Sequence, residues 1–410
     1  MSADGLLRGQ ITEESVNLMR ERIGYPNPTI RSGILTDPWN KACTDDAVRR
    51  WALSFGDDNP LYVDPDYAAK TRWGCVIAPP AFEKSMGFDR SPTMTPEFAK
   101  RTSKALRGVQ LFYSGGENFY HAPITEGMKL YRSKFVESVS EKESKFAKKS
   151  AIVTNGLALW DDEDRVVVTG TDLFVHTERR TVSNDSKIAT KDTPAFYTDE
   201  QLDEIEAAYE NEFRRGAGVL YLEDVEVGQV LPRMVKGPFT VTDLINLHMG
   251  AGWLIYGNPP YRLAYENRKA MRGFYSRDEF NAWDTVQRVH WDKSLAEQVG
   301  VPGIYDIGAI RQMMLCHYCT NWAGDDGWVW RTKFSLRNFN YVGDTTWLDG
   351  KVTAAYVDEK LGPRIEIDVT GTNQRGQINL LGSATILVAS HKHGPVRLPE
   401  TPPMPEYRAR

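Results

Sequence analysis

The chain has 410 residues and a mass of 46.4 kDa, which is too long for one small domain and comfortable for two. Its 41% hydrophobic and 26% charged residues exclude a disordered or collagen-like protein. A net charge of −5 without long runs of Lys or Arg argues against nucleic-acid binding. Four cysteines, no long apolar segment and no signal-peptide pattern predict a cytoplasmic protein that does not associate with membranes.

The first half, predicted over residues 1–180, begins with helices and continues with strands. Thr44-Asp45-Asp46 is a helix start signal, and a second, more apolar helix is predicted over residues 81–88. Runs with strand character follow at residues 129–140, 150–160 and 165–175.

A polar stretch at residues 181–218 separates this half from the next and is predicted to be a linker with one bracing helix. The apolar face of that helix and its stop signal are formed by Leu202, Ile205, Ala208, Tyr209 and Gly216. The last residues, 394–410, are rich in proline and predict an extended tail.

The second half, residues 219–393, repeats the order of the first. A helix is predicted after Thr242-Asp243, and a longer apolar helix over residues 309–323. Four runs with strand character follow, at residues 332–342, 345–357, 364–372 and 378–388. The repeat predicts an α+β fold in which a buried helix wrapped by an antiparallel sheet occurs twice.

Two segments carry a resemblance to a known family. Residues 56–64, GDDNPLYVD, resemble the hydratase motif Gly-Asp-x-Asn-Pro-aliphatic-His-x-Asp of the MaoC-like, or R-specific enoyl-CoA hydratase, family. Residues 288–308, RVHWDKSLAEQVGVPGIYDIG, resemble the second part of the same motif. That family has the hotdog fold, so the resemblance implies a double hotdog.

The chemistry of hydration explains which residues matter. Adding water to a 2-enoyl thioester needs a base for the attacking water and an acid for C2. It also needs a donor for the charge that builds on the thioester oxygen. In the family, the Asp and His of the motif transfer the protons, and a Gly at the start of the central helix supplies the N–H.

By this comparison the first half is expected to be inert. Its Asp position is Asp57, but the His position is Tyr62 and the Gly position is Pro80, which has no N–H. Asp57 and Asn59 are then expected mainly to hold the turn. The resemblance also implies a substrate channel, for which the expected binding residues are Asp57, Asn59, Tyr62, Tyr305 and Trp291.

In the second half, His290 occupies the His position, and Gly308 follows eighteen residues later, as the family spacing requires. The family's Asp position holds Thr285, whose hydroxyl is no base. We expect a one-residue bulge to present Asp284 instead, with Asp292 and Asp306 as alternatives. The resemblance thus implies His290, Asp284 and Gly308 as the catalytic residues.

Two other motifs are weaker. About thirty inserted residues follow AGWL at 251–254, and within them GNPPYR at 257–262 faintly copies the hydratase motif; we interpret it as a turn. Cys316-His317-Tyr318-Cys319 lies in the middle of a predicted helix and has no second pair, so neither a metal nor a redox cofactor is expected.

The resemblance implies a hydro-lyase acting reversibly on an enoyl thioester, with a bulky or branched acyl group on coenzyme A or a carrier protein. A homodimer is a further expectation. Two alternatives stay open. A hotdog thioesterase would need a carboxylate on the central helix, where 309–323 has none and the other helix offers only Glu83. A non-catalytic subunit would complete the pocket of another hydratase.

Overall fold

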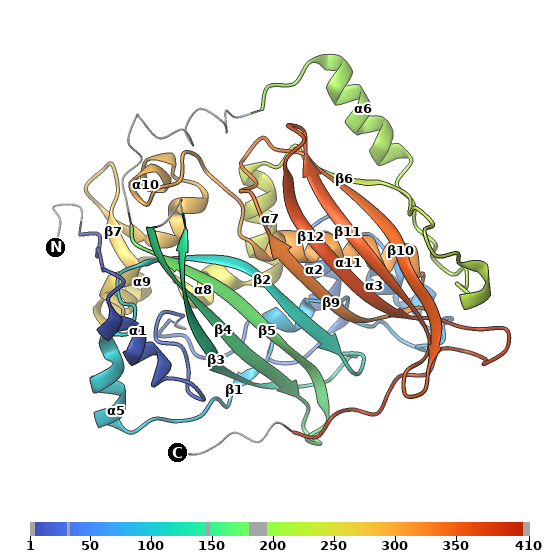
Figure 1. Cartoon of the computed structure of the whole chain (residues 1–410), viewed down its shortest axis with the longest axis horizontal. Helices are drawn as coiled ribbons and strands as arrows, with labels where there is room; N and C mark the ends of the chain where they lie inside the picture. Colours follow the sequence, from blue (N-terminus) through green and yellow to red (C-terminus); the bar gives the residue numbers. More distant parts are fainter. Residues whose placement is uncertain (1–4, 31–32, 145–147, 180–194, 405–410) are drawn as a thin grey trace.

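The computed structural model describes residues 5–30, 33–144, 148–179 and 195–404. Its main feature is one large sheet in the order β1-β3-β4-β5-β2-β9-β12-β11-β10-β6 (Figure 1). The strands of this sheet are β1 (Phe88–Asp89), β2 (Gln110–Tyr120), β3 (Tyr131–Ser144), β4 (Lys148–Trp160), β5 (Val166–Thr177), β6 (Met234–Lys236), β9 (Trp328–Leu336), β10 (Thr346–Asp358), β11 (Gly362–Asn373) and β12 (Ile378–Leu387). A small separate sheet pairs β7 (Tyr275–Arg277) with β8 (Trp283–Thr285).

The two halves of the chain meet in the middle of the sheet, where β2 pairs antiparallel with β9. On either side of this junction, three long strands follow in mirrored order, β5-β4-β3 after β2 and β12-β11-β10 after β9. The predicted repeat is therefore present in the strands. One continuous sheet joins the halves, and the domain boundaries at residues 180, 218 and 393 stay a prediction.

Strand β2 is not predicted by the sequence pattern, because a glycine pair interrupts its alternation. A Cβ at Gly115 would lie 2.4 Å from the carbonyl oxygen of Phe334, and one at Gly116 would lie 2.4 Å from that of Thr171. The two neighbouring strands thus approach β2 too closely for a side chain. A register shift between Tyr113 and Gly115 accompanies this approach.

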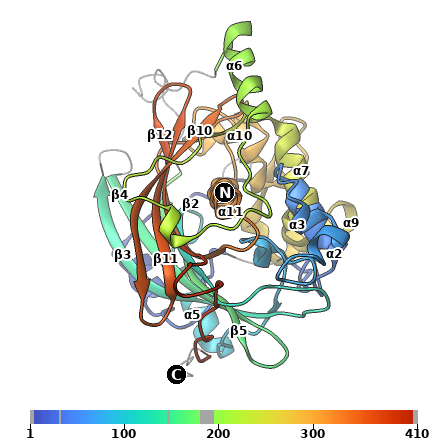
Figure 2. The ribbon, with the colours of Figure 1, turned by 90° about the vertical axis from the view of Figure 1, so that its right-hand side faces the viewer.

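The long apolar helix of the second half forms as predicted, as α11 (Ala309–Ala323). All of its residues are buried, which agrees with its many apolar residues, although Arg311 and His317 are buried as well. It lies between the sheet and a layer that contains α2 (Asp45–Leu53), α7 (Val241–Ala251) and α9 (Tyr261–Ala270) (Figure 2).

The matching helix of the first half is a wrong prediction. Residues 81–88 contain only a short 3₁₀ helix, η1 (Phe82–Ser85). Ala81 before it adopts the left-handed conformation with φ 77°, and Pro79 and Pro80 precede it, so no α-helix begins there. The fold therefore has one long central helix, and this helix serves both halves.

The observed N-caps of α2 and α7 lie at or close to the predicted helix start signals. Thr44 caps α2, whereas α7 is capped by Thr240 and not by Thr242. The bracing helix α6 (Asp199–Glu210) ends before Gly216. The remaining helices are α1 (Glu13–Arg20), α3 (Pro60–Val63), α4 (Pro65–Ala68), α5 (Pro96–Arg101), η2 (Thr102–Lys104), η3 (Leu222–Asp224), α8 (Trp253–Gly257), η4 (Arg272–Phe274), η5 (Val286–His290) and α10 (Lys293–Gln298). Over the described ranges, no helix has the length and apolar character needed to span a membrane.

Candidate active site

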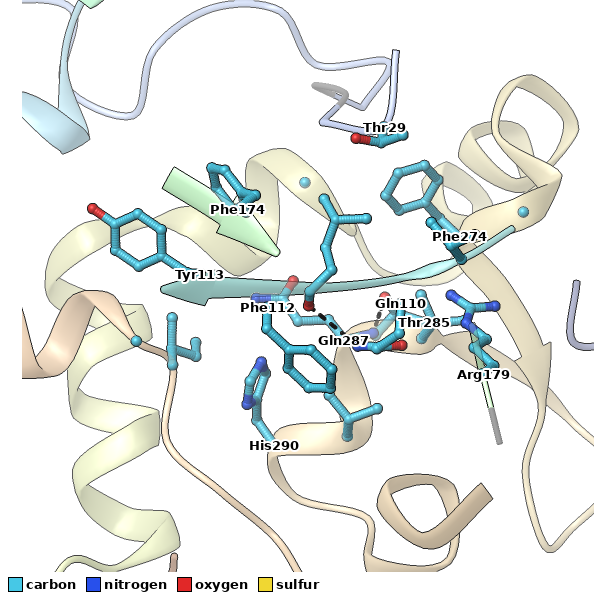
Figure 3. A pocket seen from close by; sticks show the side chains of 18 of the residues that line it. Thr29, Gln110, Phe112, Tyr113, Phe174, Arg179, Phe274, Thr285, Gln287 and His290 are labelled. Atoms are coloured by element: carbon cyan, nitrogen blue, oxygen red, sulfur yellow. Dashed lines mark hydrogen bonds between the residues drawn. The ribbon is translucent and has the colours of Figure 1, made fainter. Parts of the chain in front are cut away.

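A cavity of about 650 Å³ lies where the N-terminus of α11 meets the start of β2. Its wall combines the first residues of β2 with the loop before α11 and the η5 segment that ends at His290 (Figure 3). Tyr113 and Phe174 lie at one end of the view, and Arg179 and Phe274 lie at the other. Both halves of the chain therefore build this cavity.

His290 lines the cavity and is oriented by the backbone. Its Nδ1 lies 2.9 Å from the carbonyl oxygen of Tyr305, which only accepts, so Nδ1 carries the hydrogen and Nε2 keeps its lone pair. Burial lowers the pKa of His290 to about 4. The imidazole is therefore neutral at pH 7, as a general base must be.

Gly308 lines the same cavity and is the N-cap residue of α11. A Cβ at this position would lie 2.7 Å from Leu336 Cδ1 and 3.0 Å from Tyr113 Cδ1, so a larger residue would have to displace its neighbours. In the described part of the chain, no acceptor is recorded for its amide. An amide at a helix N-terminus is suited to stabilise negative charge.

The structure does not bring Asp284 into the cavity. Strand β8 alternates its side chains, so Thr285 lines the cavity and Asp284 does not. The Asp284 carboxylate accepts a hydrogen bond from the Thr285 amide at 2.7 Å. The expected bulge is replaced by this short regular strand.

The alternative acids are engaged elsewhere. Asp292 caps α10 and pairs with Arg288 at 2.9 Å. Asp306 lines the cavity, but it is buried against Arg311, with 2.9 Å between Arg311 Nε and a carboxylate oxygen. Burial raises the pKa of Asp306, and the adjacent Arg311 guanidinium opposes that rise.

A polar network that the sequence did not predict stands where the family places its carboxylate. The Thr285 hydroxyl donates to Asn258 Oδ1 at 2.5 Å, and Asn258 Nδ2 donates to Gln287 Oε1 at 2.7 Å. The backbone N–H of Gln287 closes the ring by donating to Thr285 Oγ1 at 3.1 Å. All three residues line the cavity. The signal that could have found Asn258 is the GNPPYR segment, which is a turn as interpreted but also reaches the site.

The other residues expected to bind substrate divide into two groups. Tyr305 lines the cavity, whereas Trp291 is half-buried outside it and packs near His248, with 6.2 Å between ring centroids. Asp57, Asn59 and Tyr62 are buried and lie outside the cavity wall.

The first motif instead stabilises its own turn. Asp57 accepts a hydrogen bond from the Asn59 amide at 3.0 Å, and Asn59 caps α3 by accepting from the Leu61 amide at 3.0 Å. These are the turn contacts expected of Asp and Asn.

Asp57 meets a histidine from the other half. His317 of α11 places Nε2 3.6 Å from Asp57 Oδ1, and both side chains are at most 1% exposed. Burial raises the pKa of Asp57 to about 6, and burial together with Lys236 and Arg214 lowers the pKa of His317. This pair has the residue types of the family dyad but is sealed from solvent.

Comparisons with known proteins agree with this architecture. Residues 31–170 match the family model described as "FAS1-like, dehydratase domain region". A solved "MaoC-like dehydratase" aligns over 90% of this chain and 99% of its own, with a TM-score of 0.58 and 17% identity. A conserved hypothetical protein of Mycobacterium tuberculosis, described as a double hotdog, aligns over 89% and 98% of the two chains, with 13% identity and a TM-score of 0.43.

Among curated proteins, a "UPF0336 protein" of Streptomyces avermitilis is 29% identical over 106 residues. The match covers 25% of this chain and 65% of that protein, so it spans just under two thirds of the relative.

The architecture is the predicted α+β double hotdog, because two sets of antiparallel strands form one sheet against a buried helix and the solved MaoC-like dehydratase shares this fold. Residues 31–170 match the FAS1-like dehydratase region, and the fold of the whole chain is similar to that of the solved MaoC-like dehydratase. The family-model match and the shared fold both support the resemblance that the two motifs carry.

Proposed function

We propose that the protein is a hydro-lyase that reversibly adds water across the C2–C3 double bond of an enoyl thioester, in the cavity at the start of α11. The observation that carries the proposal is that His290 and Gly308 line one cavity. The imidazole is a neutral base there, and the glycine amide is a donor without a recorded protein acceptor among the described residues.

In the proposed reaction, His290 Nε2 takes a proton from a water as its oxygen bonds to C3. The electrons of the double bond shift toward the thioester carbonyl, whose oxygen accepts a hydrogen bond from the Gly308 amide. The imidazolium then returns the proton to C2. One histidine thus serves as base and as acid, each worth roughly 10²–10⁴-fold.

The polar network takes the position of the missing carboxylate. Thr285, Asn258 and Gln287 form a closed ring of hydrogen bonds in the wall that also contains His290. We assign this ring the role of orienting the attacking water, and we leave Asp284 outside the reaction. Hydroxyl and amide groups can hold a water but cannot act as the second base.

The cavity volume of about 650 Å³ and the aromatic end at Tyr113 and Phe174 favour a bulky acyl group. Coenzyme A is the proposed carrier. Association into a homodimer and a cytoplasmic location remain predictions from the sequence.

The experiment uses the purified chain and a branched 2-enoyl-CoA, with the enoyl-thioester absorbance and free thiol followed together. We expect the absorbance to fall with no thiol released. Thiol release with the conjugated absorbance retained would identify a thioesterase. No reaction by the chain alone, but activity on adding a partner hydratase, would identify a non-catalytic subunit.

A further inference from the structure

The cavity wall is strongly cationic in a chain whose net charge is −5. It contains five arginines, Arg107, Arg179, Arg272, Arg311 and Arg337, and a single carboxylate, Asp306. Asp306 is paired with Arg311, so four guanidinium groups in this wall have no acid beside them among the lining residues. Such a wall attracts an anionic ligand.

Arg179 is a buried cation of this wall whose hydrogen-bonding capacity is only partly used. One guanidinium nitrogen donates to the Leu7 carbonyl at 2.7 Å, whereas Nε is buried with no recorded hydrogen-bond acceptor in the described chain. Burial and the nearby charge of Arg8 lower the pKa of Arg179 to about 10, so the group is still charged at pH 7. A buried charge without a counter-ion is unfavourable until an anion pairs with it.

The inserted segment of the second half adds a second group of cations beside this wall. The guanidinium carbons of Arg268, Arg272 and Arg277 lie 4.7, 4.9 and 5.2 Å from the centre of the Trp283 ring. Arg272 also lines the cavity, so the group is continuous with the cavity wall.

No carboxylate is recorded as an ion-pair partner of these three arginines within the described ranges. Arg262, which lies on α9 with Arg268, pairs with Glu266, so an acid neutralises an arginine elsewhere in this segment. The Asp284 carboxylate next to Trp283 is bonded to the Thr285 amide. Like charges gathered at one ring repel each other, and the indole offsets only part of that repulsion.

We propose that Arg268, Arg272 and Arg277, with Arg107 and Arg179 of the adjoining wall, bind the phosphates of a coenzyme A nucleotide. This inference rests on the proposed function, because it assigns the carrier end of the thioester. Guanidinium groups bind phosphate oxygens in pairs, and several arginines match a nucleotide with three phosphates better than the single phosphodiester of a carrier-protein arm.

The assignment also orients the substrate. The Arg179 end of the cavity lies away from Tyr113 and Phe174 (Figure 3). With the phosphates at the arginines, the pantetheine arm extends past His290 and Gly308, and the acyl group occupies the aromatic end.

The first arm of the test measures binding without catalysis. Adenosine 3′,5′-bisphosphate is titrated calorimetrically into the full chain and into the double variant Arg268→Gln/Arg272→Gln. We expect binding that weakens as salt increases and that falls at least about tenfold in the double variant. Arg262→Gln, on the same helix as Arg268 but paired with Glu266, is the matched control and should bind as the unmodified chain does. No binding of the bisphosphate, or equal binding by the double variant, would overturn the inference.

The second arm compares a coenzyme A thioester with the pantetheine thioester of the same acyl group. We expect the double variant to raise KM at least about tenfold for the first and to leave kcat/KM for the second unchanged. Equal loss on both thioesters, or an arginine dependence seen only with a carrier-protein thioester, would contradict the assignment. If the bisphosphate binds through these arginines and neither thioester reacts, the phosphate site stands and the hydratase proposal fails.

Discussion

The two halves of the molecule keep different parts of the motif on which the family resemblance rests. The first half keeps Asp57 of the motif and lacks its histidine and glycine. The second half keeps His290 and Gly308 and has Thr285 where the carboxylate is expected. The second set lines the cavity at the start of α11, so the half that keeps two of the three catalytic parts is the half with the open site.

The single central helix explains this difference. Its N-terminus meets the cavity at Gly308, whereas its later part packs against the first motif, where His317 faces Asp57. Within the described residues of the first half, the segment predicted as its central helix contains only the short helix η1. Once one helix serves both halves, the first motif becomes a packing surface, and its polar residues hold a turn rather than a substrate.

The largest expected effect comes from His290→Ala. Loss of the general base should lower kcat/KM for an enoyl thioester by about 10²–10⁴-fold. Steady-state kinetics on the purified variant measure this, with thermal unfolding to show that the fold persists. Asp57→Asn is the matched control in the other half, and equal losses in the two variants would mean that the halves have been assigned the wrong way round.

Two substitutions at Gly308 separate the contribution of its backbone N–H to catalysis from the effect of added side-chain volume. Both Gly308→Ala and Gly308→Pro place a Cβ against Leu336 and Tyr113, and overpacking of this kind costs about 1–3 kcal/mol of stability. Only proline removes the N–H. We therefore expect kcat of the proline variant to lie about 10²-fold below that of the alanine variant. Equal kcat values would exclude Gly308 as the oxyanion donor.

A smaller effect should follow from Thr285→Val, which keeps the shape of the side chain and removes the hydroxyl that joins Asn258 and Gln287. Loss of a hydrogen bond worth about 1–1.5 kcal/mol predicts a fall in kcat of about tenfold. Thr285→Ser retains the hydroxyl and should react nearly as the unmodified chain does. An unaffected valine variant would argue that the ring does not orient the water.

The smallest effect on activity, within about twofold, is expected for Asp57→Asn, whose consequence is in stability. Burial raises the pKa of Asp57 from 3.8 to about 6, so between these values the folded chain holds a proton that the unfolded chain has released. The unmodified chain therefore loses stability from this group as pH rises from about 4 to 6, by about 2–3 kcal/mol, and the asparagine variant does not. Chemical unfolding of both proteins measures the free energy of unfolding across this pH range. Relative to the unmodified chain, the variant should become more stable as pH rises. The same pH dependence in both proteins would contradict the assigned pKa.

Part of the fold could be predicted from local patterns, because α11 and the strands β10, β11 and β12 carry their own signals. The apolar run of α11 is an example, since a helix buried on all sides favours mainly apolar residues. Strand β2 was not predicted, because its glycines are required by the close approach of the neighbouring strands and local strand propensity does not reveal that approach. The helix expected at residues 81–88 does not form, because Ala81 adopts a left-handed backbone conformation. A pattern of apolar residues does not reveal such a conformation.

Motif spacing was sufficient to identify the two cavity residues His290 and Gly308, but not the other polar residues of the cavity wall. His290 and Gly308, which the motif places eighteen positions apart, line one cavity. The position of Asp284 depends on the pleat of β8, and one residue of register decides which side chain faces the cavity. Asn258 reaches Thr285 from another part of the insertion, and a contact of that kind is set by tertiary structure alone.

The most direct test is a crystal structure of the chain with a 3-hydroxyacyl-CoA bound. The account predicts that the thioester oxygen accepts a hydrogen bond from the Gly308 amide and that the 3-hydroxyl lies within hydrogen-bonding distance of His290 Nε2. A ligand seated instead between Asp57 and Tyr62, with the cavity at the start of α11 empty, would contradict it.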